Sequence, residues 1–353
     1  MKKVLVFLLG VILVLLLVGF INYSRPTFDD RVEDEDICAQ YGIRFNGTSI
    51  ERIYLDPEGI LKDFDRFRTQ DRAYQLLVQD RQMTNNPVPN KAFERRLEKL
   101  SDKTPSEREQ QLPFQLYKQL ITKKESFCQQ VAPYVLGYLP ERTEIGATIY
   151  LTALDNAAAG FTDYPEISYN ISHPLFAGAA RLYQGTGISS VYNLLAHELH
   201  HIGYANNFDL SEFSQEELRE NGIVIDTLLP LHREGIATYI SHQLTPVYPI
   251  QLEWPHYLFE KEFAVRMYIN QLNDILAEAQ SKPTGEAYNE LYQRISDIGF
   301  NKKGFYIVGA YMAMTVDEQL GKDTLAQSVS DGFNSYVRIY NSLAEEDMKI
   351  IFE

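Results

Sequence analysis

The chain has few basic residues relative to acidic ones. It has 353 residues, of which 33 are Lys or Arg and 48 are Asp or Glu, so its formal net charge is −15 at pH 7. Nucleic acid is therefore not an expected partner, because a phosphate-binding surface needs clustered Lys and Arg. The chain also lacks internal repeats and long low-complexity tracts, and its 45% of hydrophobic residues fits a globular protein.

Long apolar runs are missing except near the N-terminus, where residues 4–21 carry no charge. A helix of this length spans about 27 Å, close to the roughly 30 Å of bilayer hydrocarbon. We predict a signal-anchor transmembrane helix at residues 1–22. A cleaved signal peptide and a buried core helix are the alternatives, although residues 18–20 make a poor cleavage site. No cysteine follows closely, which argues against a lipoprotein anchor.

The lysines before this segment set the expected location. Lys2 and Lys3 should stay in the cytoplasm by the positive-inside rule, so the rest of a single-pass protein of the cell membrane would lie outside it. Cleavage of the segment would give a secreted protein instead. The membrane is thus an expected partner through the N-terminal helix, and the oligomeric state is left open.

Cys38 and Cys128 are the only cysteines. A location outside the cytoplasm permits a disulfide between them, and two separate thiols are the other interpretation. Both cysteines fall in residues 23–140, for which we predict an acidic stalk at residues 29–36 and then a helical domain. Apolar residues such as Phe64 and Phe67 recur there at helical spacing.

The hydrophobic period changes at residue 144, so we place a domain boundary near residue 140. Residues 144–152 and 166–172 alternate apolar and polar side chains, which predicts two strands, and residues 154–165 are predicted to be a loop. Helices are expected from there to the end of residues 141–353. The predicted fold class is α+β, mostly α, with a small sheet beside the helix described next.

The sequence LLAHELHH, residues 194–201, places two histidines on one face of a helix predicted at residues 189–202 and ended by Gly203. His197 and His201 are one helical turn apart, so both imidazoles can reach one metal ion. Glu198 points toward the same opening and is free to act as a base. His200 falls to the side and is interpreted as a neighbour rather than a ligand.

A catalytic zinc needs a third protein ligand, and Glu234 is our candidate. It lies among apolar residues in a helix predicted at residues 228–241, where a buried carboxylate is costly unless it is paired or metal-bound. Gly235 and Ala237 would let this helix approach the histidine helix closely. The alternative is that Glu234 pairs with Arg233 on a helix surface.

The motif HELHH at residues 197–201, followed by EGIATY at residues 234–239, resembles the gluzincin metallopeptidases. The resemblance covers residues 144–353, and the nearest group is a family of bacterial zinc-dependent peptidases known mainly from their sequences. It implies a zincin-like fold, with His197, His201 and Glu234 as zinc ligands and Glu198 as the general base.

Other parts of the resemblance are less specific. Residues 154–160 lie where such enzymes keep an edge strand and loop against the substrate backbone, although a tight turn is an equal interpretation. Tyr306 is the favoured oxyanion donor, ahead of Tyr311 and Tyr239. Thr238 departs from the family, which often has an acid there, and Asn193 or Asp226 could orient a ligand histidine instead.

The sequence therefore predicts a membrane-anchored zinc peptidase whose catalytic domain lies outside the cytoplasm, with one Zn²⁺ per chain and a peptide or protein as substrate. Two alternatives remain. One is a binding or scaffold protein on an inactive peptidase-like fold, and the other is a helical structural protein in which the motif is fortuitous.

Overall fold

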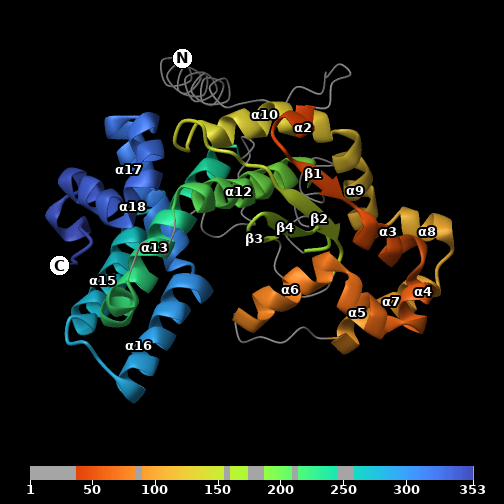
Figure 1. The fold of residues 1–353 in the computed structure, drawn as a ribbon, viewed down its shortest axis with the longest axis horizontal. Helices are drawn as coiled ribbons and strands as arrows, with labels where there is room; N and C mark the ends of the chain where they lie inside the picture. Colours follow the sequence, from red (N-terminus) through yellow and green to blue (C-terminus); the bar gives the residue numbers. More distant parts are fainter. Residues whose placement is uncertain are drawn as a thin grey trace, which may run out of the picture.

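The computed structural model describes residues 37–83, 90–154, 160–173, 187–208, 214–244 and 258–352. Within them the protein is mostly helical, with one small four-stranded mixed sheet, as the α+β prediction expected. In Figure 1 the sheet and helix α12 (Gly187–Asn207) occupy the middle of the molecule. The N-terminal helices lie on one side of them and the C-terminal helices on the other.

The N-terminal helices are short, and aspartate and threonine caps start several of them. Asp56 accepts a hydrogen bond from the Gly59 amide, and Thr104 forms a capping box with Glu107. Such caps satisfy amides that have no partner inside the helix. The helices are α2 (Ile37–Gln40), α3 (Thr48–Leu55), α4 (Pro57–Lys62), α5 (Phe64–Gln70), α6 (Arg72–Met83), α7 (Asn90–Ser101), α8 (Pro105–Glu109), α9 (Leu112–Thr122) and α10 (Lys124–Leu136).

This N-terminal part is not purely helical, because it supplies strand β1 (Arg44–Asn46) to the sheet. A disulfide joins Cys38 of α2 to Cys128 of α10, so of the two interpretations the bridge is the one that the structure shows. One continuous set of buried residues runs from Cys38 to Ile350. The division of the chain near residue 140 stays a prediction.

The sheet has the order β1-β2-β4-β3, with β2 (Thr148–Thr152), β3 (Gly160–Asp163) and β4 (Glu166–Asn170). Strands β1, β2 and β4 are parallel to one another, and β3 runs antiparallel to β4 at the edge. The predicted strands are present, and their alternating residues Ile149, Leu151, Ile167 and Tyr169 are buried. The loop predicted for residues 154–165 is wrong at residues 160–163, which form β3. Residues 155–159 lie outside the described part.

Helix α12 lies against the sheet and α10. The hydroxyl of Tyr169 in β4 donates to the carbonyl of Val191 in α12 at 3.0 Å, which ties the sheet to this helix. The prediction that Gly203 ends the helix is wrong, because α12 continues to Asn207. Gly203 serves packing instead: a Cβ there would lie 2.2 Å from Cδ1 of Leu139.

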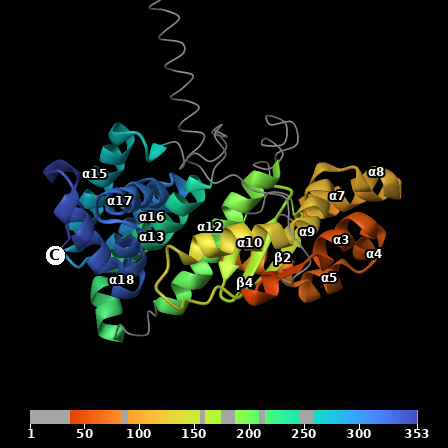
Figure 2. The same cartoon turned by 90° about the horizontal axis from the view of Figure 1, so that it is seen from above.

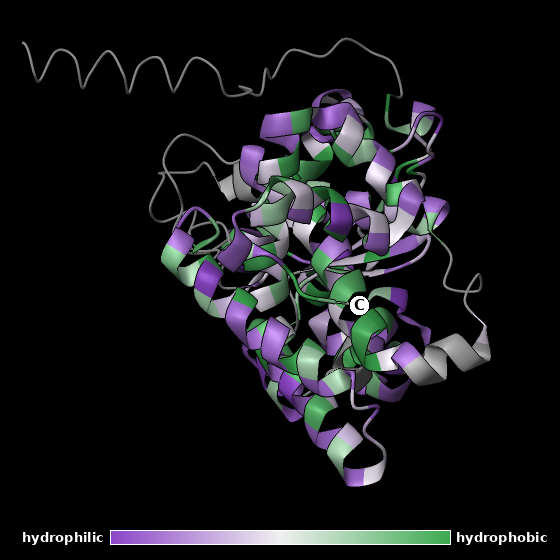
Figure 3. Cartoon of the chain, turned by 90° about the vertical axis from the view of Figure 1, so that its left-hand side faces the viewer, coloured by the Kyte–Doolittle hydropathy of each residue, from purple (hydrophilic) through white to green (hydrophobic). Residues whose placement is uncertain are grey.

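The C-terminal helices gather on the other side of α12 (Figure 2). Apolar and polar residues alternate along them, as expected for helices with one buried face (Figure 3). They are α13 (Gln215–Gln243), α15 (Glu262–Ala279), α16 (Gly285–Ser296), the π-helix η2 (Asp297–Asn301), α17 (Gly304–Leu320), α18 (Lys322–Leu343) and the 3₁₀ helix η3 (Glu346–Met348).

Gly235 does allow a close helix approach, but the partner differs from the prediction. A Cβ on Gly235 would lie 2.4 Å from backbone atoms of Gly309, and one on Gly309 would lie 2.1 Å from the carbonyl oxygen of Leu231. The glycine pair therefore brings α13 against α17, not against α12. The first turn of α17 carries Tyr306, whose ring lies beside His197 of α12.

The apolar segment at residues 4–21 lies outside the described residues. Among the helices that are described, none combines the length and the apolar character needed to cross a membrane.

Candidate metal centre

Helices α12 and α13 bring three potential ligand atoms to one point. Nε2 of His197 and Nε2 of His201 are 3.0 Å apart. Oε2 of Glu234 lies 3.3 Å from the first and 3.2 Å from the second. All three side chains are largely buried, and within the described residues they form the one cluster with the composition and spacing of a metal site.

The donor set fits zinc. Two imidazole nitrogens and one carboxylate oxygen are a common catalytic set, and metal–ligand distances of 2.0–2.1 Å put tetrahedral ligands roughly 3.3 Å apart. The three observed separations, 3.0, 3.2 and 3.3 Å, are near that value. Three atoms with lone pairs at such spacing repel one another unless a cation or shared protons lie between them. The arrangement therefore suits a cation bound by three protein ligands.

Arg233 holds the other oxygen of Glu234. Its guanidinium donates from Nη2 to Oε1 at 3.0 Å and from Nε at 3.2 Å. Burial alone would raise the pKa of Glu234, but His201, Arg233 and His197 outweigh it and hold this pKa well below its usual value. The carboxylate is thus an anion at neutral pH, with Oε2 directed to the histidines. The expected alternative, a Glu234–Arg233 pair, is present together with the histidine contacts.

Glu198 lies beside the edge strand. Thr162 of β3 donates to Oε2 of Glu198 at 2.6 Å, and Glu198 is only 5% exposed. A Cβ on Gly160 would lie 2.4 Å from Oε1, so a larger residue at this position would displace the carboxylate. The sequence analysis missed Thr162, because this residue lies in the segment that was predicted to be a loop. The available signal was the short run Gly160–Asp163 just before Tyr164-Pro165, a dipeptide typical of the turn that follows a strand.

The three tyrosines considered as oxyanion donors have different surroundings in the structure. The Tyr306 ring stacks on the His197 ring, with centroids 6.2 Å apart and an angle of 11° between their planes. The Tyr239 hydroxyl instead donates to Asp317 at 2.8 Å, and Tyr311 contacts Tyr340 edge-on. Of the three, Tyr306 is the one placed beside a histidine of the cluster.

For the residues considered for orienting the histidines, the structure gives only their positions. Asn193 is buried on α12 one turn before His197, whereas Asp226 lies near Tyr288 of α16. Thr238 is buried on α13. His200 is fully buried, and burial holds its pKa well below the usual value, so it is a neutral core histidine.

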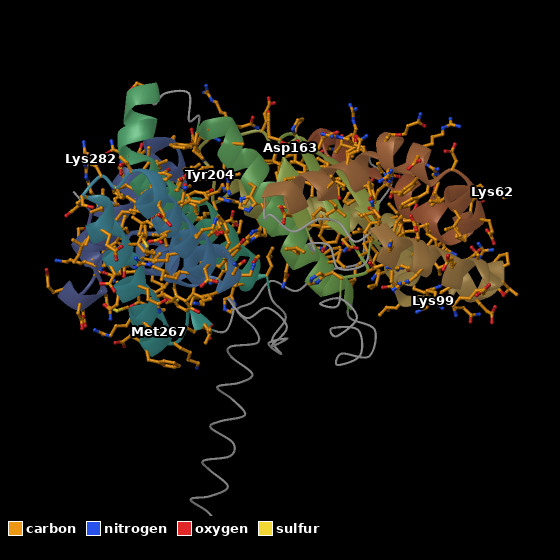
Figure 4. All side chains as sticks on the ribbon, turned by 90° about the horizontal axis from the view of Figure 1, so that it is seen from below. Lys62, Lys99, Asp163, Tyr204, Met267 and Lys282 are labelled. Carbon is orange, nitrogen blue, oxygen red and sulfur yellow. A yellow bond between two sulfur atoms is a disulfide. The ribbon has the colours of Figure 1, made fainter. Side chains whose placement is uncertain are left out.

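A buried polar chain behind the site was not foreseen from the sequence. The Tyr204 hydroxyl of α12 lies 2.8 Å from Nδ1 of His232 in α13, and Nε2 of His232 lies 3.1 Å from the Ser328 hydroxyl in α18. Tyr204 lies between the two ends of the molecule marked by Lys62 and Lys282 (Figure 4). Burial lowers the pKa of His232 to about 3, so this chain is neutral and fixes the relative positions of three helices.

The comparisons with known proteins agree with this centre. A family model described as "Putative zinc dependent peptidase (DUF5700)" matches residues 72–349, which include all three potential ligands and Glu198. No curated protein and no solved structure matches the chain. Because the match covers well over half of the sequence, the chain belongs to this family.

Proposed function

We propose that the protein is a gluzincin-type zinc peptidase with a zincin-like catalytic region. The observation that supports it most is the convergence of His197, His201 and Glu234 at 3.0–3.3 Å, with Glu198 on the same helix one residue from His197. His197, His201 and Glu234 would hold one zinc ion. When bound, zinc supplies a Lewis acid that lowers the pKa of a water molecule and polarises a carbonyl group.

Glu198 acts as the general base in this proposal. Its carboxylate accepts the proton that the attacking water loses and passes it to the leaving amine. The Thr162 hydroxyl donates to Oε2, so it fixes the carboxylate and leaves Oε1 to accept the proton. Tyr306, beside His197, donates a hydrogen bond to the scissile carbonyl oxygen as negative charge develops on it.

Strand β3 gives the substrate a place to bind. In the described part of the sheet, β3 pairs with β4 on one side only. An extended peptide can add to such a strand edge through main-chain hydrogen bonds. Since Gly160 and Thr162 of β3 touch Glu198, a peptide on this edge would lie beside the general base. The resemblance to gluzincins led us to expect this kind of strand pairing with the substrate at residues 154–160.

Zinc content is the first test of this function. We expect about one zinc per chain by mass spectrometry after purification without added zinc, and its loss from Glu234→Ala, because two histidines alone make an incomplete site. Arg233→Met keeps all three donors but releases Oε1, so zinc affinity in chelator competition should fall roughly 10- to 100-fold.

Glu260→Ala is the matched control, since Glu260 pairs with His242 at 2.9 Å outside the cluster, and it should retain zinc. If the native protein binds no zinc even when zinc is supplied, the peptidase proposal is lost.

We also propose that the catalytic region lies outside the cytoplasm. The uncharged residues 4–21 and the disulfide between Cys38 and Cys128 support this, because disulfides persist in oxidising compartments. When cells are lysed in an alkylating reagent, we expect both cysteines to escape modification unless a reductant is added first. Full alkylation without reductant, on correctly folded protein, would place the chain in a reducing compartment and contradict the proposal.

A further inference from the structure

Lys303 is a residue that the start of helix α17 does not favour. It occupies the N-cap position, where Ser, Thr, Asp and Asn are preferred, and its cation lies at the positive end of a helix dipole. Its backbone is left-handed, with φ 65° and ψ 23°, a region that Gly and Asn enter more readily. The dipole of α17 is offset by that of η2, which ends at Asn301 and favours a cation nearby. The N-cap position and the left-handed backbone still oppose lysine, so we look for the role of its side chain outside the helix.

The ammonium group of Lys303 lies beside the proposed catalytic centre. Nζ is 4.5 Å from the centroid of the Tyr306 ring, whose plane stacks on His197. Its charge also reaches the far end of β4: burial, and then the charge of Lys303, lower the pKa of His173. Lys303 is therefore placed between the first turn of α17 and the end of the sheet.

The charge of Lys303 is not neutralised by a carboxylate within the part of the chain that the structure describes. Its neighbour Lys302 differs, since it pairs with Asp297 at 2.7 Å. At the metal cluster, Arg233 is already paired with Glu234 at 3.0 Å. Lys303 is thus the cation near the cluster that has a charge left to offer a ligand.

We propose that Lys303 binds a carboxylate of the peptide substrate and so gives the enzyme a preference for anionic peptides. This rests on the proposed peptidase function. A carboxylate on a peptide has two sources, an acidic side chain or the free C-terminus, and the second would make the enzyme act near peptide ends. A charge-assisted hydrogen bond from a partly desolvated ammonium is strong enough for about tenfold selectivity.

The test uses the zinc-loaded full chain and pools of peptides that are blocked at the N-terminus and randomised over neutral residues. One pool is neutral with an amidated C-terminus, a second carries one glutamate with an amidated C-terminus, and a third is neutral with a free C-terminal carboxylate. We expect one or both anionic pools to be cleaved about tenfold faster than the neutral pool. Comparison of the second and third pools identifies the source of the carboxylate.

Two substitutions and a matched control assign the preference to one residue. Lys303→Met should abolish it, and Lys303→Glu should reverse it in favour of the neutral pool. Lys302→Met, which removes the adjacent paired cation, should leave it unchanged. Equal cleavage of all pools by the native protein, full preference in Lys303→Met, or the same loss in Lys302→Met would each overturn the assignment.

Binding separates this inference from the proposed function. The same pools are applied to the Glu198→Gln variant, with and without Lys303→Met, and the retained peptides are quantified by mass spectrometry. Selective retention of anionic peptides that depends on Lys303, with no cleavage by the native protein, would sustain the binding role and reject the peptidase function. Retention without regard to charge would reject the binding role whether or not peptides are cleaved.

Discussion

Glu198→Gln is expected to lower kcat by about 10²- to 10⁴-fold, the range that a positioned general base contributes. Glutamine keeps the shape of the side chain, and its amide oxygen can still accept the hydrogen bond that Thr162 donates to Glu198 at 2.6 Å. It cannot take a proton at neutral pH. The loss should therefore be in kcat, measured on a peptide that the native protein cleaves.

Zinc content separates this loss from damage to the metal site. Glu198 is not one of the three clustered donors, so the variant should bind as much zinc as the native chain. Glu141→Gln removes one exposed carboxylate elsewhere and should keep full activity. Native activity in Glu198→Gln would contradict the proposed base. Joint loss of zinc and activity would show instead that the substitution had disturbed the ligands.

The features that the sequence predicted well depend on short-range geometry. His197 and His201 are one helical turn apart, so helix formation alone brings them together. Glu234 could be found because a carboxylate in an apolar helix needs a partner, and the structure supplies two kinds, the histidines and Arg233. Neither argument required knowledge of how distant elements pack.

The features that the sequence did not predict depend on tertiary packing. Thr162 reaches Glu198 only because β3 takes the edge position beside β4. Gly235 was expected to contact α12, but its partner is Gly309, 74 positions further along the chain. The three residues of β1 are too few to show an alternating pattern, and their pairing with β2 alone makes them a strand.

The disulfide was left open for the same reason, since spacing cannot decide a pairing, and its removal is the largest stability change that we expect. Cys38 and Cys128 are 90 positions apart and 2% or less exposed, with their Cα atoms 5.1 Å apart. Closing a loop of that length lowers the entropy of the unfolded chain by an amount worth about 4 to 5 kcal/mol at 25 °C. Native disulfides commonly contribute about 2 to 5 kcal/mol.

Reduction of the native protein should therefore lower its free energy of unfolding in urea by about 2 to 5 kcal/mol. The reduced protein is a cleaner comparison than a Cys38→Ser variant, because it keeps both sulfur atoms in the core and places no new hydroxyl there. Cys38→Ala with Cys128→Ala should lose at least as much, since it adds a small cavity to the same loss.

The position of the disulfide also predicts that zinc binding should survive its reduction. It joins α2 to α10, and α10 packs against α12, which carries His197 and His201. The three proposed ligand atoms come from α12 and α13, so zinc binding should persist in the reduced protein below its unfolding transition. A change of less than 1 kcal/mol on reduction would show that the unfolded chain is little constrained by the bridge. Zinc release before unfolding would show that α10 holds α12 in place.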